Sequence, residues 1–128
     1  MMRISRRQLS QYVAESLING KSEVVEQVAA YLLMNGRTKE ADLLVRDVEK
    51  ALESRGVVVA HVRSAHQLDE SQRNEIESLL KNKFNAKSVS TKDMVDEDLL
   101  GGVVVRTASD EFDGSLRRNI NRLKSMKV

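Results

Sequence analysis

Residues 98–106 of this chain read DLLGGVVVR, and residues 113–118 read DGSLRR. Three consecutive valines are typical of a buried β-strand, because β-branched side chains pack well on a pleated surface. Two adjacent glycines before such a run indicate a sharp bend or a close backbone approach, since glycine reaches positive φ without a Cβ clash. The stretch therefore predicts a strand over residues 102–107 that is entered through a tight bend.

The residues around this strand alternate between strand and helix patterns. A β-branched run predicts a strand over residues 57–62, and a weaker pattern predicts another over residues 88–95. Between them, Asp69 and Gln72 have the spacing of a capping box, which predicts the start of a helix. The DGSLRR segment heads a final amphipathic helix with apolar residues at helical spacing.

The first 55 residues are predicted to form three helices that stop at glycines, the last of them at Gly56. Ser22 and Thr38 are predicted to cap the second and third helices, because serine and threonine are favoured at that position. The second helix is expected to place Val25 on the same apolar face as Val28.

Composition limits the size and class of the fold. The chain has 128 residues, of which 41% are hydrophobic and 31% charged, so it is expected to be folded and to hold one domain or two very small ones. It contains no cysteine, which excludes disulfides and thiolate metal sites. The predicted fold class is α+β: a short three-helix domain in residues 1–55, followed by a small β-α-β-β-α domain in residues 56–128.

No pattern for bond chemistry is present. Ser115 lacks the G-x-S-x-G context of a hydrolase nucleophile, and Gly101-Gly102 is neither a dinucleotide fingerprint nor a phosphate loop. His61 and His66 have no second ligand cluster nearby. The sequence therefore predicts no catalytic residue, no metal and no cofactor.

Binding to nucleic acid is the alternative that the charge pattern leaves open. The net charge is only +2, but Arg117, Arg118 and Arg122 lie on the predicted final helix, and a basic helix on a small α/β domain can contact phosphates. Against this, the few aromatic residues are scattered and form no stacking platform, and an acidic cluster over residues 93–98 would repel a phosphate backbone. Nucleic acid is therefore not expected as a partner.

The order of an acidic residue, two aliphatics, Gly-Gly, a β-branched strand and Asp-Gly-Ser before a helix resembles the C-terminal signature of F-type ATP synthase delta subunits. The mitochondrial oligomycin-sensitivity-conferring subunit belongs to the same family. The likeness is strongest over residues 96–124 and extends more loosely back to Gly56. The signature residues in this sequence are Asp96, Leu99, Leu100, Gly101, Gly102, Val103, Val105, Arg106, Asp113, Gly114 and Ser115.

The resemblance implies a noncatalytic peripheral-stalk subunit that ties the catalytic head to the stalk. In this family a six-helix domain receives the N-terminal segment of an alpha subunit, and the C-terminal part meets stalk subunit b. The resemblance thus implies a place on the cytoplasmic face of a bacterial cell membrane, with membrane association only through the complex. With three helices in place of six, the helical domain is expected to hold the alpha segment weakly or with help from another subunit. The candidate partner surface comprises apolar residues of the helical domain and arginines of the last helix: Leu9, Val13, Val28, Leu32, Leu44, Val48, Arg117, Arg118 and Arg122.

Overall fold

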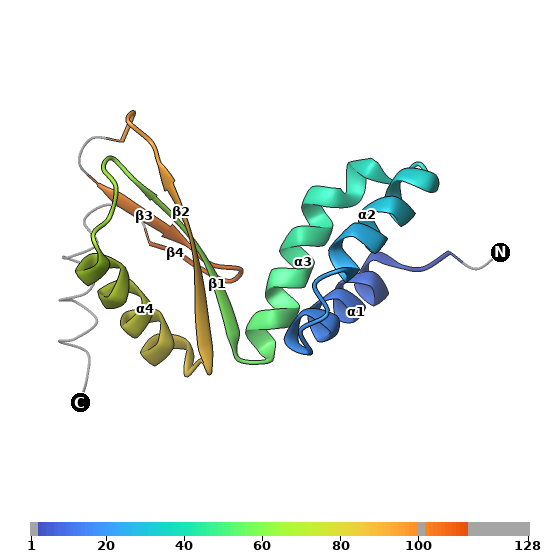
Figure 1. The fold of residues 1–128 in the computed structure, drawn as a ribbon, viewed down its shortest axis with the longest axis horizontal. Coiled ribbons are helices and arrows are strands. Elements are labelled where there is room, and N and C mark those ends of the chain that lie inside the picture. Colours follow the sequence, from blue (N-terminus) through green and yellow to red (C-terminus); the bar gives the residue numbers. More distant parts are fainter. Residues whose placement is uncertain (1–2, 100–101, 113–128) are drawn as a thin grey trace. The chain divides into compact units, whose positions relative to one another are not determined.

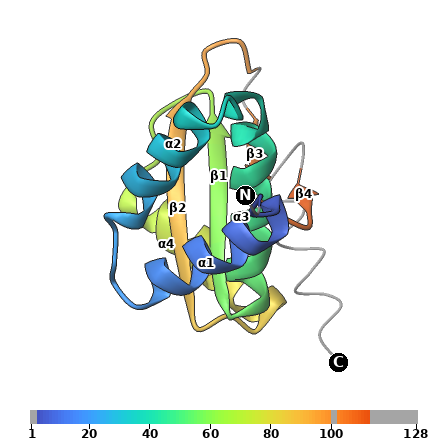
Figure 2. The same ribbon diagram turned by 90° about the vertical axis from the view of Figure 1, so that its right-hand side faces the viewer.

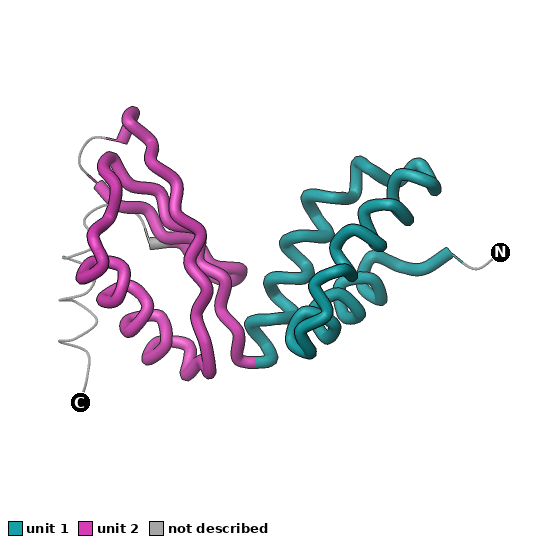
Figure 3. The backbone as a smooth tube through the Cα atoms, in the orientation of Figure 1, with its two compact units in different colours: residues 1–55 teal, residues 56–128 magenta. Residues whose placement is uncertain are grey.

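A computed structural model describes residues 3–99 and 102–112 of the chain. The chain divides into two compact units, residues 1–55 and residues 56–128, which are coloured separately in Figure 3. We call them the helical unit and the sheet unit. The α+β fold class predicted from the sequence is confirmed, with helices alone in the first unit and a mixed sheet in the second (Figure 1).

The helical unit contains three α-helices and one turn of 3-10 helix. In chain order these are α1 (Arg6–Ile18), α2 (Val24–Met34), η1 (Thr38–Glu40) and α3 (Ala41–Ser54). Two polar contacts join α1 to the α3 segment: Arg6 Nε lies 2.6 Å from Asp47 Oδ2, and Arg55 Nη2 donates to Gln11 Oε1 at 2.7 Å.

The helix starts in this unit differ from the prediction. α1 begins with a capping box, in which the Ser5 hydroxyl accepts the Gln8 N–H and the Gln8 side chain accepts the Ser5 N–H. The prediction that Ser22 and Thr38 cap helices is wrong, because no side chain caps the start of α2, η1 or α3. Main-chain turns bond the N–H groups there instead, as in the 3.0 Å bond from Glu40 N to the Arg37 carbonyl.

The predicted glycine stop after α3 is confirmed at Gly56. Its φ is +88°, in the left-handed region that favours glycine. Its carbonyl accepts the N–H groups of Lys87 and Ser88 at 2.8 and 3.2 Å, and a Cβ at Gly56 would lie 3.2 Å from the Lys87 Cγ. The residue therefore starts the sheet unit in a conformation and a space that a larger side chain would strain.

The sheet unit is built around four strands and one described helix. Its elements are β1 (Val57–Ser64), α4 (Glu70–Phe84), β2 (Ser88–Val95), β3 (Val103–Arg106) and β4 (Glu111–Phe112). The strand order is β2-β1-β3-β4, from left to right in Figure 2. β1 pairs in parallel with β2 and antiparallel with β3, and β3 pairs antiparallel with β4. α4 supplies the crossover that a parallel pair requires.

The sequence predictions for this unit are largely confirmed. The three predicted strands form, and α4 begins with the predicted capping box, in which Gln72 N donates to Asp69 Oδ1 at 2.7 Å. β4 was not predicted as a strand of its own. The predicted final helix lies outside the described residues.

Packing of α4 against one face of the sheet forms the core of this unit. Its fully buried members are Ala60, Val62, Ile76, Leu80 and Val105. Burial of these side chains removes apolar surface from water and holds α4 against the sheet. In the part of the chain that the structure describes, every helix is too short or too polar to span a lipid bilayer.

Candidate functional site

The apolar residues predicted to face a partner are buried in the helical unit. All six are only 5% to 9% exposed: Leu9, Val13, Val28, Leu32, Leu44 and Val48. Because these side chains are buried, a partner could reach them only if the helices of the unit moved apart. Their role in partner binding therefore stays a prediction.

Asp96, the first residue of the signature, closes the turn that follows β2. Its carboxylate accepts the N–H of Asp98 at 3.1 Å and lies 3.6 Å from the guanidinium of Arg63. Its own N–H donates to the Ser64 carbonyl at 2.8 Å, just beyond the last pair of the β1–β2 ladder. Asp96 therefore has a structural role at the end of the parallel strands.

The strand that follows in the signature also serves packing. Val105 is part of the buried core, and Val103 packs against it. Arg106 is exposed and lies in register with His61 on β1 and Glu111 on β4. Two further signature positions, Leu99 and Gly102, are half-buried. The other predicted residues lie outside the described part of the chain: Leu100, Gly101, Asp113, Gly114, Ser115, Arg117, Arg118 and Arg122.

Among the described residues of the helical unit, the two most exposed apolar side chains lie on α2. Leu33 and Met34 are 71% and 84% exposed, and Val25 is also exposed. With Ala29 and Ala30, which are exposed too, they form what we call the α2 outer side. A helix that is apolar nearly all round is normally covered by other elements. The α2 outer side is therefore the best candidate in the described residues for a surface that binds another helix.

Sequence reasoning missed this surface because α2 has almost no polar face. Only Glu26 and Gln27 of its residues are charged or amide-bearing. The predicted apolar face includes Val25, but the unit buries Val24, Val28 and Leu32 and leaves Val25 exposed. α2 has more apolar residues than one buried face can hold. This excess is the feature of the sequence that indicates a second, exposed apolar surface.

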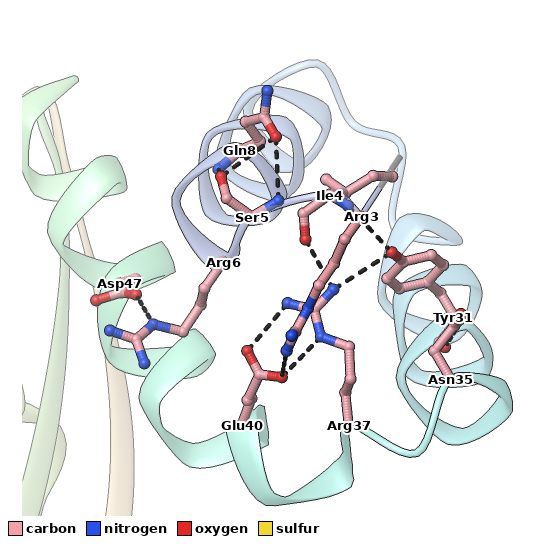
Figure 4. Close-up of polar contacts among 10 residues, drawn as sticks. All are labelled: Arg3, Ile4, Ser5, Arg6, Gln8, Tyr31, Asn35, Arg37, Glu40 and Asp47. Atoms are coloured by element: carbon pink, nitrogen blue, oxygen red, sulfur yellow. Dashed lines mark hydrogen bonds and ion pairs between the residues drawn. The ribbon is translucent and has the colours of Figure 1, made fainter. Parts of the chain in front are cut away.

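A polar corner adjoins the C-terminal end of α2 and is centred on the buried side chain of Arg37 (Figure 4). Arg37 Nε and Nη2 donate to the two oxygens of Glu40 at 2.7 and 3.0 Å. Its Nη1 donates to the Ile4 carbonyl at 2.7 Å and to the Tyr31 hydroxyl at 3.3 Å. Arg3 Nη2 reaches the same Glu40 carboxylate at 3.2 Å. Arg37 thus ties the segment before α1 to the connection between α2 and α3.

These contacts also fix the charge of the corner. Hydrogen bonding from Arg37 lowers the pKa of Glu40 from 4.5 to about 2, and the Glu40 carboxylate raises the pKa of Arg37. Glu40 is therefore ionised at any pH near neutrality. The Arg37 guanidinium also lies 5.7 Å from the centre of the Tyr31 ring, within cation–π distance.

By fold and surface the chain is a small α+β protein with an apolar helix side open to solvent. No cluster of His, Cys, Asp and Glu that could hold a metal ion occurs in the residues that the structure describes. The chain belongs to the ATP synthase delta (OSCP) subunit family, whose family model matches residues 2–126. The resemblance seen in the signature is thereby confirmed.

Individual relatives agree with this assignment. ATP synthase subunit delta of Leuconostoc citreum is 29% identical over 111 residues, covering 86% of this chain and 62% of the relative. The subunit of the same name from Agrobacterium fabrum is 41% identical over 70 residues, covering 55% of this chain and 37% of the relative. The chain thus spans less than two thirds of the length of these relatives.

A chain in the cryo-EM structure of the Toxoplasma gondii mitochondrial ATP synthase hexamer has a similar fold. The TM-score is 0.56 at 12% sequence identity, and the match covers 95% of this chain and 69% of that chain. At this identity the likeness concerns the fold alone.

Proposed function

We propose that this chain is a noncatalytic peripheral-stalk subunit of an F-type ATP synthase, which links the catalytic head to the stalk. The observation that carries the proposal is the family match over residues 2–126. A subunit with this role performs no bond chemistry. It works through binding surfaces and through enough stiffness to resist the torque of the rotor.

The proposed surface for the head is the α2 outer side. An amphipathic helix can lay its apolar face along such a surface, with anchors at helical spacing. Val25, Ala29 and Leu33 are spaced four residues apart, so they form one continuous stripe along α2. The partner proposed for it is the N-terminal segment of an alpha subunit.

The sheet unit is proposed to meet stalk subunit b. Its parallel ladder runs over eight paired positions, from Val57↔Ser88 to Ser64↔Val95, and α4 is packed on it through a buried core. A ladder of this length backed by a helix is a stiff element, as a mechanical link requires. The protein would then lie at the cytoplasmic face of the bacterial membrane, attached only through the complex.

Affinity capture of the tagged chain from its own cells tests this proposal. Mass spectrometry of the captured material is expected to identify the alpha subunit and subunit b, and the purified chain alone is expected not to hydrolyse ATP. Capture of RNA or DNA without ATP synthase subunits would contradict the stalk role and support the nucleic-acid alternative.

A further inference from the structure

A pocket of about 610 Å³ opens beside the C-terminal end of α2. Its lining combines the polar corner with the turn that follows α2: Arg3, Tyr31, Asn35, Gly36, Arg37, Lys39 and Glu40. In Figure 4 the side chains of Arg3 and Arg37 converge on Glu40. The wall of the pocket therefore carries four charged side chains, although it adjoins an apolar helix side.

Positive charge exceeds negative charge in this pocket. Arg3, Arg37 and Lys39 are cationic and only Glu40 is anionic, which leaves a net charge of +2. The negative end of the α2 dipole, about half an elementary charge, offsets only part of this excess. A concave site with surplus positive charge attracts an anion.

Part of that positive charge is available to a ligand. The Glu40 carboxylate is shared by Arg37 and Arg3, and the Arg3 side chain is otherwise largely exposed. Lys39 is exposed, and its side chain forms no hydrogen bond or ion pair with any residue that the structure describes. The ammonium of Lys39 and the outer N–H groups of Arg3 can therefore bind an incoming group without breaking the Arg37–Glu40 pair.

The pocket opens at the C-terminal end of α2, next in the sequence to the last residue of the α2 outer side. Met34, the most exposed apolar residue of α2, immediately precedes Asn35 in the pocket wall. A helix lying along α2 through its apolar face would bring one of its ends to the pocket. A side chain at that end can then reach Lys39 and Arg3.

We propose that this pocket is a carboxylate subsite, which receives an acidic residue at the end of the helical segment held on the α2 outer side. The inference rests on the proposed function, because it specifies the chemistry of the segment that α2 binds. The apolar contacts would supply affinity, and the carboxylate would fix the direction and register in which the segment binds.

A protein carboxylate fits this place better than a nucleic acid does. Duplex DNA carries about one negative charge per 1.7 Å along its axis, so its backbone needs cations over an extended surface. Here the cations occupy one pocket, Glu40 lies among them, and the neighbouring surface is the apolar α2 outer side. One or two carboxylates next to apolar anchors match that arrangement.

The test uses the full chain and two synthetic amphipathic helical peptides with the same apolar face. One peptide carries two glutamates at each end, and the other carries glutamines there. Calorimetric titration at low salt is expected to show about 3- to 10-fold tighter binding of the glutamate peptide, since exposed ion pairs contribute about 0.2 to 1 kcal/mol each. The preference is expected to shrink as salt is raised.

A double variant tests whether the preference for the glutamate peptide arises in the pocket. Arg3→Gln with Lys39→Gln removes both available cations but leaves the Arg37–Glu40 pair, and it is expected to bind the two peptides equally. The control is Lys50→Gln, which changes an exposed lysine on α3 and is expected to keep the preference. Melting temperatures of all variants check that each is folded.

The outcomes separate this inference from the proposed function. Equal binding of both peptides by the unaltered chain, or a preference that survives the double variant, would overturn the carboxylate subsite while leaving the α2 surface in place. Failure of both peptides to bind would overturn the subsite and the proposed α2 surface together. Tighter binding of a single-stranded RNA oligonucleotide than of the glutamate peptide would assign the pocket to nucleic acid instead.

Discussion

Leu33 allows binding and folding to be perturbed separately, because its side chain is 71% exposed in the free chain. Burying a whole leucine side chain contributes about 1.5 to 3 kcal/mol. Since roughly seven tenths of this side chain is still open to a partner, its burial in a complex is worth about 1 to 2 kcal/mol. Leu33→Gln is therefore expected to weaken binding of an alpha-subunit N-terminal peptide about 5- to 30-fold.

The same substitution should hardly affect folding. Leucine and glutamine have similar helix propensities, and changes at exposed positions usually alter the free energy of unfolding by less than about 0.5 kcal/mol. Leu43→Gln is the matched control, because Leu43 is a leucine on α3 that is 47% exposed and lies outside the α2 outer side. Calorimetric titration gives the dissociation constants, and urea unfolding gives the stabilities.

Two results would show that Leu33 does not act as a binding residue. If Leu33→Gln bound the peptide as tightly as the unaltered chain, the α2 outer side would not be the contact surface. If Leu33→Gln lowered the free energy of unfolding by 2 kcal/mol or more, on the order of a core truncation, Leu33 would be acting in the fold of the helical unit.

Three further predictions concern the fold. Leu80→Ala, at a position only 1% exposed, is expected to lower the free energy of unfolding by about 2 to 5 kcal/mol, measured by urea titration. Gly56→Ala is expected to destabilise by about 1 to 2 kcal/mol because of its positive φ, and an unchanged melting temperature would show that this turn relaxes freely. Because the pKa of Glu40 is about 2 when folded and 4.5 ordinarily, its ionised form stabilises the fold fully above pH 4.5, and this contribution is lost as the pH falls toward 2. Stability should therefore drop less steeply over that range in Glu40→Gln than in the unaltered chain.

The parts of the fold that the sequence predicted are those determined by neighbouring residues. Asp69 and Gln72 form the predicted capping box because both of its hydrogen bonds lie within one helical turn. The strand pattern after Gly56 likewise placed β1 correctly, since β-branched residues favour the extended backbone locally. Ser5 and Gln8 have the same spacing, so the capping box at the start of α1 is also a local feature of the sequence.

The parts that the sequence did not predict depend on residues far apart in the chain, or on which of several similar residues becomes buried. Arg37 bonds to the Ile4 carbonyl, 33 positions away, and no local pattern marks such a contact. On α2, apolar residues occupy nearly every side, so helical periodicity could not decide that Val24 is buried while Val25 is exposed. Ser22 and Thr38 had the right chemistry for caps, but main-chain turns satisfied the N–H groups first.

We propose that this one chain bridges the head and the stalk of an ATP synthase. Native mass spectrometry of the purified chain, mixed with the isolated catalytic head and the soluble part of subunit b from the same cells, tests it most directly. The expected result is a complex that contains all three and that does not form when the chain is omitted. A folded chain that bound neither component, or only one of them, would show that it does not bridge the head and the stalk.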